Sequence, residues 1–255
     1  MGRFVKMRKS KEAARWDAWY EKQETTAAPQ EIPQELTRLP SPLQTMLDVG
    51  CGTGEMVRFW AGRQVHATGL DISKNAIRRA VKLTPPLLSP FCQWTAEDWK
   101  MTSLTDRGWN SAFDLVYSSM GPDMTNMDDL RKLTAASRRY VRLLVFKDGY
   151  NSVLQNISKT FCGNTTLSSA LDRTGQILAL LNKDGYTPSV KDIRFREIWA
   201  PSLEIWEQYI GTIFPSLAHS PKLKEYLLSL SEENLIPSET TAIYSMMTWT
   251  PHHWP

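Results

Sequence analysis

The residues Met46-Leu47-Asp48-Val49-Gly50-Cys51-Gly52-Thr53-Gly54-Glu55 (46–55) decide the fold of this chain. They begin as a short apolar run and end in three glycines at alternate positions, 50, 52 and 54. Glycine lets the backbone turn sharply and approach a ligand closely, because it carries no β-carbon. A helical stretch follows from Glu55 to Gly62, and its first N–H groups are available to a ligand in the turn. The stretch therefore predicts a strand–turn–helix unit that binds a ligand.

Strand-like and helix-like segments alternate along the chain beyond this unit. Strands are expected at 45–50, 66–71, 91–96, 113–119, 140–146, 190–198 and 241–249. Helices are expected at 55–62, 73–83, 126–138, 168–183, 203–214 and 221–231. Such alternation is typical of a parallel sheet with helices on both faces. We therefore expect an α/β fold: a doubly wound, Rossmann-like, mostly parallel sheet of seven strands.

Two segments are not needed to complete this sheet. Residues 1–44 combine a helix that carries Trp16, Trp19 and Tyr20 with a proline-rich, extended connector, and we expect them to form a lid. Residues 201–240 form a helical insertion before the last strand, which we expect to bind substrate. The predicted division is 1–44, a core at 45–200, the insertion at 201–240, and a final strand and tail at 241–255.

Composition limits the class of protein. With 255 residues, 42% of them hydrophobic, the chain can bury a core, which excludes overall disorder. The formal net charge of +3 is too small to imply a nucleic-acid partner. Its three cysteines form no CxxC pair, so we expect no zinc site or other metal site, and a reducing, cytoplasmic location. No apolar run is long enough to span a membrane, so no membrane partner is expected.

Two carboxylates near the glycine turn indicate the kind of ligand. Asp71 follows the second predicted strand, 21 residues after Gly50, where it can accept two hydrogen bonds from a ribose diol. A dinucleotide site would have a small residue where Glu55 stands, and it needs no acid at the position of Asp48. Acidic groups repel a pyrophosphate and favour a ligand with ammonium and sulfonium charges. The pattern predicts a nucleoside site for a cationic ligand.

The sequence DVGCGTGE followed by GLDIS resembles the first two motifs of class I S-adenosylmethionine-dependent methyltransferases, over residues 45–148. The resemblance implies S-adenosyl-L-methionine as cofactor and S-adenosyl-L-homocysteine as its product. It assigns cofactor binding to residues at the ends of the first four strands: Asp48, Gly50, Cys51, Gly52, Gly54, Asp71, Ile72, Glu97, Asp98, Trp99, Ser118 and Met120.

Roles follow from the family pattern for the first two motifs. The backbone from Gly50 to Gly52 would contact the methionine part of the cofactor. Asp48 would orient its amino group, mostly indirectly. Asp71 would hold both ribose hydroxyls, and Ile72 would stack against adenine.

The family pattern also gives roles to the ends of the third and fourth strands. Asp98 would meet the adenine amine, with Trp99 as a wall. Ser118 and Ser119 fall at the methyl-transfer centre, and Asp123 is the nearest candidate for a general base. An Asn/Asp-Pro-Pro-aromatic motif, typical of amino methylation of bases and amides, is absent, which argues against nucleic-acid and protein-glutamine substrates.

The sequence therefore predicts in-line methyl transfer to a small-molecule acceptor, for which positioning and desolvation can suffice. Aromatic residues outside the core are the expected substrate contacts: Trp16, Trp19, Tyr20, Trp199 and Trp206. Two alternatives stay open. A tRNA or rRNA methyltransferase would bind RNA with a steep salt dependence. A non-catalytic adapter on the same fold would bind the cofactor weakly or not at all.

Overall fold

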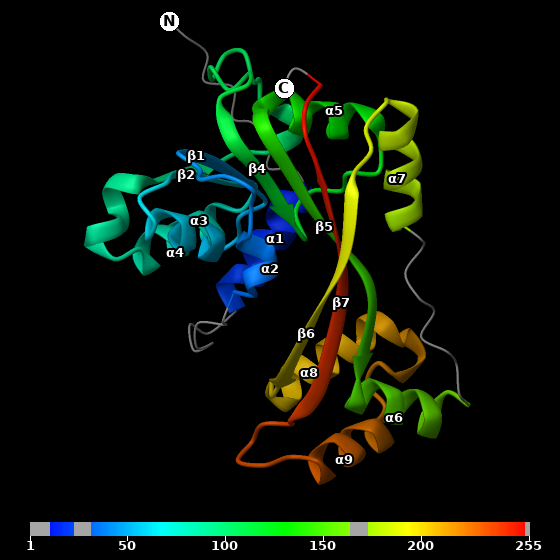
Figure 1. The fold of residues 1–255 in the computed structure, drawn as a ribbon. Coiled ribbons are helices and arrows are strands. Elements are labelled where there is room, and N and C mark those ends of the chain that lie inside the picture. Colours follow the sequence, from blue (N-terminus) through cyan, green and yellow to red (C-terminus); the bar gives the residue numbers. More distant parts are fainter. Residues whose placement is uncertain (1–10, 23–31, 164–172, 253–255) are drawn as a thin grey trace, which may run out of the picture. The chain divides into compact units, whose positions relative to one another are not determined.

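A computed structural model describes residues 11–22, 32–163 and 173–252 (Figure 1). Parts of the predicted lid and tail, at 1–10, 23–31 and 253–255, lie outside the described residues, as does the start of the helix predicted at 168–183. The chain divides into two compact units. The first comprises Met1–Val145, Thr174–Lys191 and Met246–Pro255, and the second comprises Phe146–Arg173 and Asp192–Ser245. The four-part division predicted from the sequence stays a prediction.

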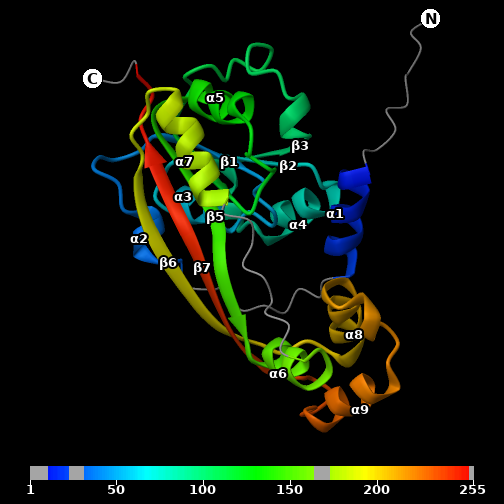
Figure 2. The same ribbon diagram turned by 90° about the vertical axis from the view of Figure 1, so that its right-hand side faces the viewer.

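One seven-stranded sheet organises the chain. Its strands are β1 (Thr45–Val49), β2 (His66–Asp71), β3 (Cys92–Ala96), β4 (Phe113–Ser119), β5 (Ser137–Asn151), β6 (Ser189–Trp199) and β7 (Ser238–Trp249). They lie in the order β3-β2-β1-β4-β5-β7-β6. The first five are joined by parallel pairs, and β7 runs opposite to β5 (Figure 2). The predicted α/β, mostly parallel sheet of seven strands is confirmed.

Helices cover both faces of the sheet in the first unit. Helices α3 (Glu55–Ala61) and α4 (Lys74–Leu83) lie on one face, and α5 (Met127–Ala136) and α7 (Arg173–Lys183) lie on the other (Figure 1). Two short 3₁₀ turns, η1 (Pro86–Phe91) and η2 (Trp99–Met101), flank β3. Ser73 caps α4, since its hydroxyl accepts a hydrogen bond from the Ala76 N–H at 3.1 Å. The helix start predicted at this serine is therefore confirmed.

The core of the first unit lies between the sheet and helices α5 and α7. Leu47, Val116 and Leu130 are completely buried there, and each such side chain contributes about 1.5–3 kcal/mol by leaving water. The Trp249 indole N–H donates to the Thr134 hydroxyl at 2.9 Å, which joins β7 to α5. Burial of the central strands on both faces explains why β1 and β4 are mostly apolar in sequence.

The segment before the sheet contains two helices. Helix α1 (Lys11–Lys22) packs against α4. Helix α2 (Gln34–Thr37) forms within the stretch that was expected to be extended. Its single turn buries Leu36, and the buried Arg142 guanidinium donates to the carbonyls of Leu36 (2.6 Å) and Arg38 (3.1 Å). The prediction of an extended connector was wrong here because tertiary hydrogen bonds and burial outweigh the local proline signal.

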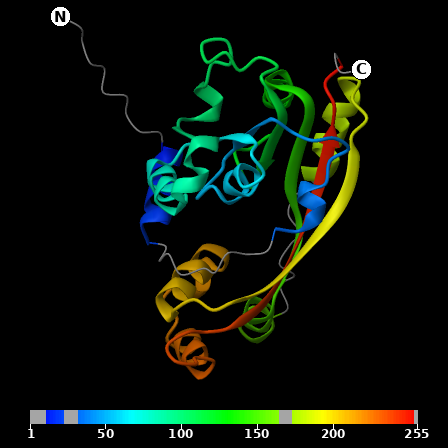
Figure 3. The same cartoon turned by 60° about the vertical axis from the view of Figure 1, so that its left-hand side comes forward.

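The second unit combines parts of β5, β6 and β7 with helices α6 (Ser152–Phe161), α8 (Leu203–Ile213) and α9 (Pro221–Ser229) and the 3₁₀ turn η3 (Pro215–Leu217) (Figure 3). Its core contains the fully buried side chains of Ile157, Trp206, Ile210 and Leu227. Helices α8 and α9 were predicted. Helix α6 was not, although Asn151 caps it by accepting from the Leu154 N–H at 3.0 Å. Among the described residues, no helix has the length and apolar character needed to cross a membrane.

Candidate functional site

The glycine turn after β1 has a backbone that only glycine adopts easily. Gly50, Gly52 and Gly54 have φ angles of +80°, +53° and +81°. A β-carbon on Gly50 would lie 2.5 Å from the Gly121 Cα, and one on Gly54 would lie 2.1 Å from the Trp94 ring. Real β-carbons do not come so close to other atoms, so the turn requires glycine at both positions. The turn is thus packed tightly against its own domain, and the N–H groups of Gly50 and Cys51 hold it to β2 through the Leu70 carbonyl.

Asp71, at the end of β2, is held in place by two backbone donors. Its Oδ2 accepts from the Gly52 N–H at 2.9 Å, and its Oδ1 accepts from the Ser73 N–H at 2.8 Å. Each carboxylate oxygen has a further lone pair. Burial raises the pKa of Asp71, while these two N–H donors act in the opposite direction. The carboxylate is therefore oriented beside the glycine turn and can still accept the two hydroxyls of a ribose.

Asp48, on β1, is 4% exposed. Burial, and secondarily the charge of Asp71, raise the pKa of Asp48 to about 8. A buried acid in this state favours a cationic neighbour, because a positive charge nearby stabilises its ionised form. Cys51 is buried inside the turn beside it, where burial raises the pKa of its thiol. The surroundings of the turn fit a ligand with an ammonium group better than they fit a pyrophosphate.

The loops after β1 and β4 meet at the carboxyl end of the sheet. The Ser118 hydroxyl donates to the Val49 carbonyl at 2.8 Å, and Gly121 lies against Gly50. Strands β1 and β4 are neighbours whose crossovers leave in opposite directions, as the strand order indicates. Ligands of doubly wound sheets bind at this switch point. Ser118 is therefore engaged in joining the two loops.

The remaining residues of the β4 loop are more accessible. Ser119 is half-buried, and Asp123 is exposed. Met120 is 69% exposed and has a φ of +51°, an uncommon backbone conformation for methionine. The structure thus brings Ser118, Ser119 and Met120 to the end of β4, next to the glycine turn.

Tyr117 is a polar residue of this region that the sequence did not single out. It is 4% exposed, its hydroxyl hydrogen-bonds the Ser119 side chain, and burial raises its pKa. It also pairs in register with Asp48 on the neighbouring strand. In the sequence FDLVYSS it looked like one more apolar strand residue. The alternation of side chains along β4, which places Tyr117 and Ser119 on one face, was the available signal.

The predicted adenine side lies at the end of β3. The Glu97 N–H donates to the Asp71 carbonyl at 2.9 Å, which places this corner beside the ribose carboxylate. The Glu97 side chain pairs with Arg107, and Asp98 accepts from the Lys100 N–H at 2.9 Å. Ile72 is half-buried. A cavity of about 530 Å³ borders Glu97 and is lined by Gln93, Thr95, Glu97, Met101, Ser103, Asp106, Arg107 and Trp109.

Trp99 does not face this cavity. Its ring is 1% exposed and belongs to the core of the first unit. The Lys132 ammonium donates to the Trp99 carbonyl at 2.5 Å and lies 4.7 Å from the ring centroid. The indole is thus covered in this structure, and its role as a wall for adenine stays a prediction.

Of the three aromatic residues predicted on the first helix, Tyr20 reaches the glycine turn. A β-carbon on Gly52 would lie 2.7 Å from the Tyr20 hydroxyl oxygen. Trp16 is half-buried, with its ring centroid 6.4 Å from that of Tyr20. Trp19 is 48% exposed. The helix therefore presents Tyr20 to the predicted cofactor site and Trp19 to solvent.

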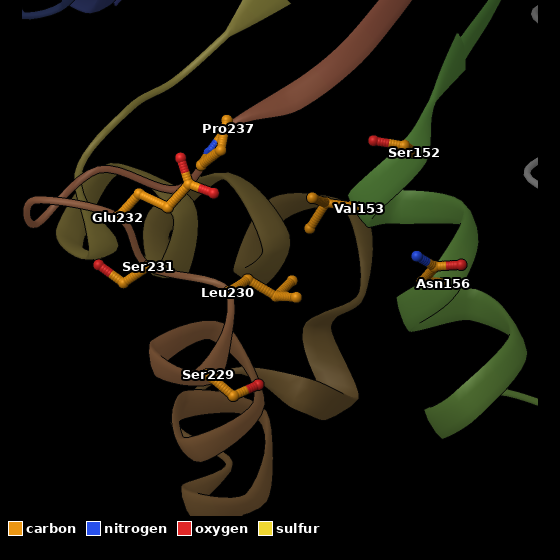
Figure 4. A pocket seen from close by; sticks show the side chains of 8 residues that line it. All are labelled: Ser152, Val153, Asn156, Ser229, Leu230, Ser231, Glu232 and Pro237. Carbon is orange, nitrogen blue, oxygen red and sulfur yellow. The ribbon is translucent and has the colours of Figure 1, made fainter.

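Trp199 and Trp206 belong to the second unit. Trp206 is fully buried, and its indole N–H donates to the Ile236 carbonyl at 3.0 Å. The Trp199 ring lies 4.7 Å from it and 5.2 Å from Tyr209. Both tryptophans therefore contribute to the core of that unit, and their contact with a substrate stays a prediction. A separate pocket of about 370 Å³ is lined by Ser152, Val153, Asn156, Ser229, Leu230, Ser231, Glu232 and Pro237 (Figure 4).

Comparison with known proteins agrees with this geometry. Residues 46–143 match the family described as a methyltransferase domain, a range that contains the glycine turn, Asp71 and the end of β4. The chain contains a class I S-adenosylmethionine-dependent methyltransferase domain. The resemblance predicted from the two sequence motifs is thereby confirmed. Within the part of the chain that the structure describes, no three His, Cys, Asp or Glu side chains group as metal ligands would.

Relatives of the methyltransferase domain are found by sequence and by fold. A 2-methyl-6-phytyl-1,4-hydroquinone methyltransferase of Synechocystis sp. is 37% identical over 91 residues, which are 35% of this chain. The chain spans about a quarter (26%) of the length of that relative. Two solved structures share the fold at a TM-score of 0.50. One is a proposed methyltransferase of Bacillus halodurans C-125, with 13% identity over 86% of this chain and 96% of the other. The other is a proposed type II methyltransferase of Anaeromyxobacter dehalogenans, with 14% identity over 82% and 91%.

Proposed function

We propose that this protein is an S-adenosylmethionine-dependent methyltransferase that acts on a small molecule. The observation that carries the proposal is the placement of Asp71. Its two oxygens are held by the N–H groups of Gly52 and Ser73, beside a glycine turn and inside the methyltransferase domain. A carboxylate fixed in this way recognises a ribose diol without having to reorganise.

The residues of the site fit the parts of the cofactor. The glycine turn and Asp48 would hold the amino-acid part, since Asp48 is a buried acid that a cation would ionise. Asp71 would hold both ribose hydroxyls, and Ile72 and Asp98 would contact the adenine ring. When bound, S-adenosylmethionine supplies an electrophilic methyl group on a sulfonium.

The chain's own contribution to transfer is positioning and exclusion of water. An in-line approach of the acceptor to the methyl group gains most from being held in place. Ser119 is half-buried and Met120 is exposed at the end of β4, and they are the proposed neighbours of the acceptor. Asp123 is exposed on the same loop and is the proposed base for an acceptor that must lose a proton. Ser118 acts by holding the loop on Val49 rather than by proton transfer.

The proposed methyl acceptor is a small molecule, and the proposed location of the protein is the cytoplasm. The relative from Synechocystis is named for methylating a hydroquinone, and the formal net charge of +3 offers little electrostatic attraction for RNA. In the described part of the chain, which contains all three cysteines, none of them forms a disulfide, which suits a reducing compartment. Residues 1–44 and 201–240 remain the proposed lid and substrate-binding insertion.

Isothermal titration with S-adenosylhomocysteine tests the proposal. We expect binding that Asp71→Ala weakens by about 1–3 kcal/mol, because the ribose hydroxyls lose their acceptors. Asp148→Ala, a matched change at an exposed aspartate of the second unit, should leave the affinity unchanged. Wild-type protein that does not bind S-adenosylhomocysteine would reject the proposal. Binding of tRNA with a steep salt dependence would replace the small-molecule substrate with RNA.

A further inference from the structure

Tyr20 lies directly over the glycine turn. Its hydroxyl oxygen would be 2.7 Å from a β-carbon on Gly52, and its side chain is half-buried. The backbone that it faces is the part of the turn whose N–H binds Asp71. Elsewhere on α1, Trp19 is exposed and Asp17 contacts the start of α4.

Asp17 holds α1 in the position that brings Tyr20 to the turn. Its Oδ1 accepts from the Ser73 hydroxyl at 2.7 Å and from the Asn75 N–H at 3.1 Å, and its carbonyl accepts from the Asn75 side chain at 2.9 Å. Asp17 is 6% exposed, so these bonds are shielded from water. Ser73 is also the residue whose N–H binds Asp71. Helix α1 is therefore attached to the same loop that orients the ribose carboxylate.

The charges around Tyr20 favour a hydroxyl that donates a hydrogen bond. Burial raises the pKa of Tyr20 far above its ordinary value; Asp71, Cys51 and Asp48 act in the same direction, and Arg79 acts in the opposite one. The hydroxyl thus keeps its proton at any physiological pH. The carboxyl groups of Asp48 and Asp71 beside the turn suit the ammonium and sulfonium groups of the cofactor but repel its α-carboxylate. That carboxylate needs a donor, and the protonated Tyr20 hydroxyl lies at the part of the turn assigned to the amino-acid end.

We propose that Tyr20 donates a hydrogen bond to the α-carboxylate of S-adenosylmethionine, and that Asp17 is a positioning residue that holds α1 in place for this contact. The inference rests on the proposed function. It assigns Tyr20 to the cofactor, whereas the aromatic pattern of the helix had indicated the substrate.

Two ligands separate this contact from a general effect on the site. S-adenosylhomocysteine carries the α-carboxylate, and 5′-methylthioadenosine has the same nucleoside without the amino-acid part. In calorimetric titrations, Tyr20→Phe should weaken S-adenosylhomocysteine binding about 10- to 100-fold, the effect of losing a hydrogen bond to a charged group. Binding of 5′-methylthioadenosine should not change. Tyr150→Phe, at an exposed tyrosine of the second unit, is the matched control.

A double-mutant comparison with Tyr20 tests the positioning role of Asp17. Asp17→Ala should reproduce the selective loss of S-adenosylhomocysteine affinity, and it should add nothing in a Tyr20→Phe background, because both changes remove the same contact. Asp17→Asn keeps an oxygen acceptor for Ser73 and Asn75 and should restore most of the affinity. Glu21→Gln, an exposed change on the same helix, should behave as wild type. The melting temperature of each variant shows whether the fold is kept.

The outcomes distinguish this inference from the proposed function. Wild-type protein that binds no S-adenosylhomocysteine rejects both. Wild-type binding that Tyr20→Phe leaves unchanged rejects the Tyr20 contact alone. Equal losses for the two ligands in Tyr20→Phe also overturn it, since they would mean that Tyr20 supports the whole site rather than the carboxylate.

Discussion

Gly50→Ala is the substitution for which the structure gives the clearest magnitude. Alanine at a φ of +80° is disfavoured by about 1–2 kcal/mol relative to an ordinary backbone conformation. Its β-carbon would also lie 2.5 Å from the Gly121 Cα and 3.1 Å from the Pro122 Cδ. Carbon atoms prefer about 3.5–4.0 Å, so the β1 and β4 loops must separate by about 1 Å. Overpacking of this kind costs a further 1–3 kcal/mol or so, about 2–5 kcal/mol in total.

Urea unfolding followed by tryptophan fluorescence measures this loss. Gly62→Ala is a matched control in the same chain, because Gly62 has a φ of −62° and a β-carbon there would meet no atom closer than 3.5 Å. It should change the free energy of unfolding by no more than about 1 kcal/mol. The reasoning would be refuted if Gly50→Ala and Gly62→Ala had the same stability, since the glycine turn would then tolerate a side chain.

Three other substitutions test different parts of the structure. Burial raises the pKa of Asp48 in the folded state to about 8, above its unfolded value near 3.9, so folding favours the protonated acid and this stabilisation is lost as pH rises. Between pH 5 and 8, the free energy of unfolding of wild type relative to Asp48→Asn should therefore fall by up to about 1.4 kcal/mol per pH unit. A difference that stays constant with pH in urea titrations would contradict this. Arg142→Met removes the donors to the Leu36 and Arg38 carbonyls, so it should lower the free energy of unfolding by about 2–3 kcal/mol and speed limited proteolysis near residue 36. Cleavage at the wild-type rate would show that other contacts hold the connector. Trp206→Ala should lower the free energy of unfolding by about 3–5 kcal/mol because it empties a fully buried site, and a loss below 1 kcal/mol or so would exclude a core role.

The sheet and most helices could be predicted from the sequence because their signals are local. The bounds of β2 and β4 and the cap at Ser73 depend on runs of a few residues and on one hydroxyl. Helix α6 escaped prediction because the polar residues at 147–151, Lys-Asp-Gly-Tyr-Asn, suggest a loop, whereas β5 continues through them to the start of the helix. Helix α2 escaped because it depends on Arg142, a residue about a hundred positions away that no local pattern links to it.

The site could be predicted where the geometry of the backbone itself requires particular residue types. Glycine spacing and the position of Asp71 follow from how a turn meets a ligand, and the structure brings them together. Aromatic residues were harder to place, because a tryptophan serves a core and a ligand site equally well. Trp99 and Trp206 proved to be buried in the cores of the two units. Tyr20 reaches the glycine turn because Asp17 docks its helix on Ser73, and a single sequence does not reveal such a tertiary contact.

The central claim is that Asp71 receives the ribose hydroxyls of the cofactor. Calorimetric titration of wild type and Asp71→Ala with S-adenosylhomocysteine and with its 2′-deoxyribose analogue tests it most directly. Wild type should bind the deoxy analogue about 5- to 100-fold more weakly, because one oxygen of Asp71 loses its partner. Asp71→Ala should bind the two ligands equally. If Asp71→Ala kept the wild-type preference for the ribose hydroxyl, the carboxylate would not be its acceptor, and the account of this site would be contradicted.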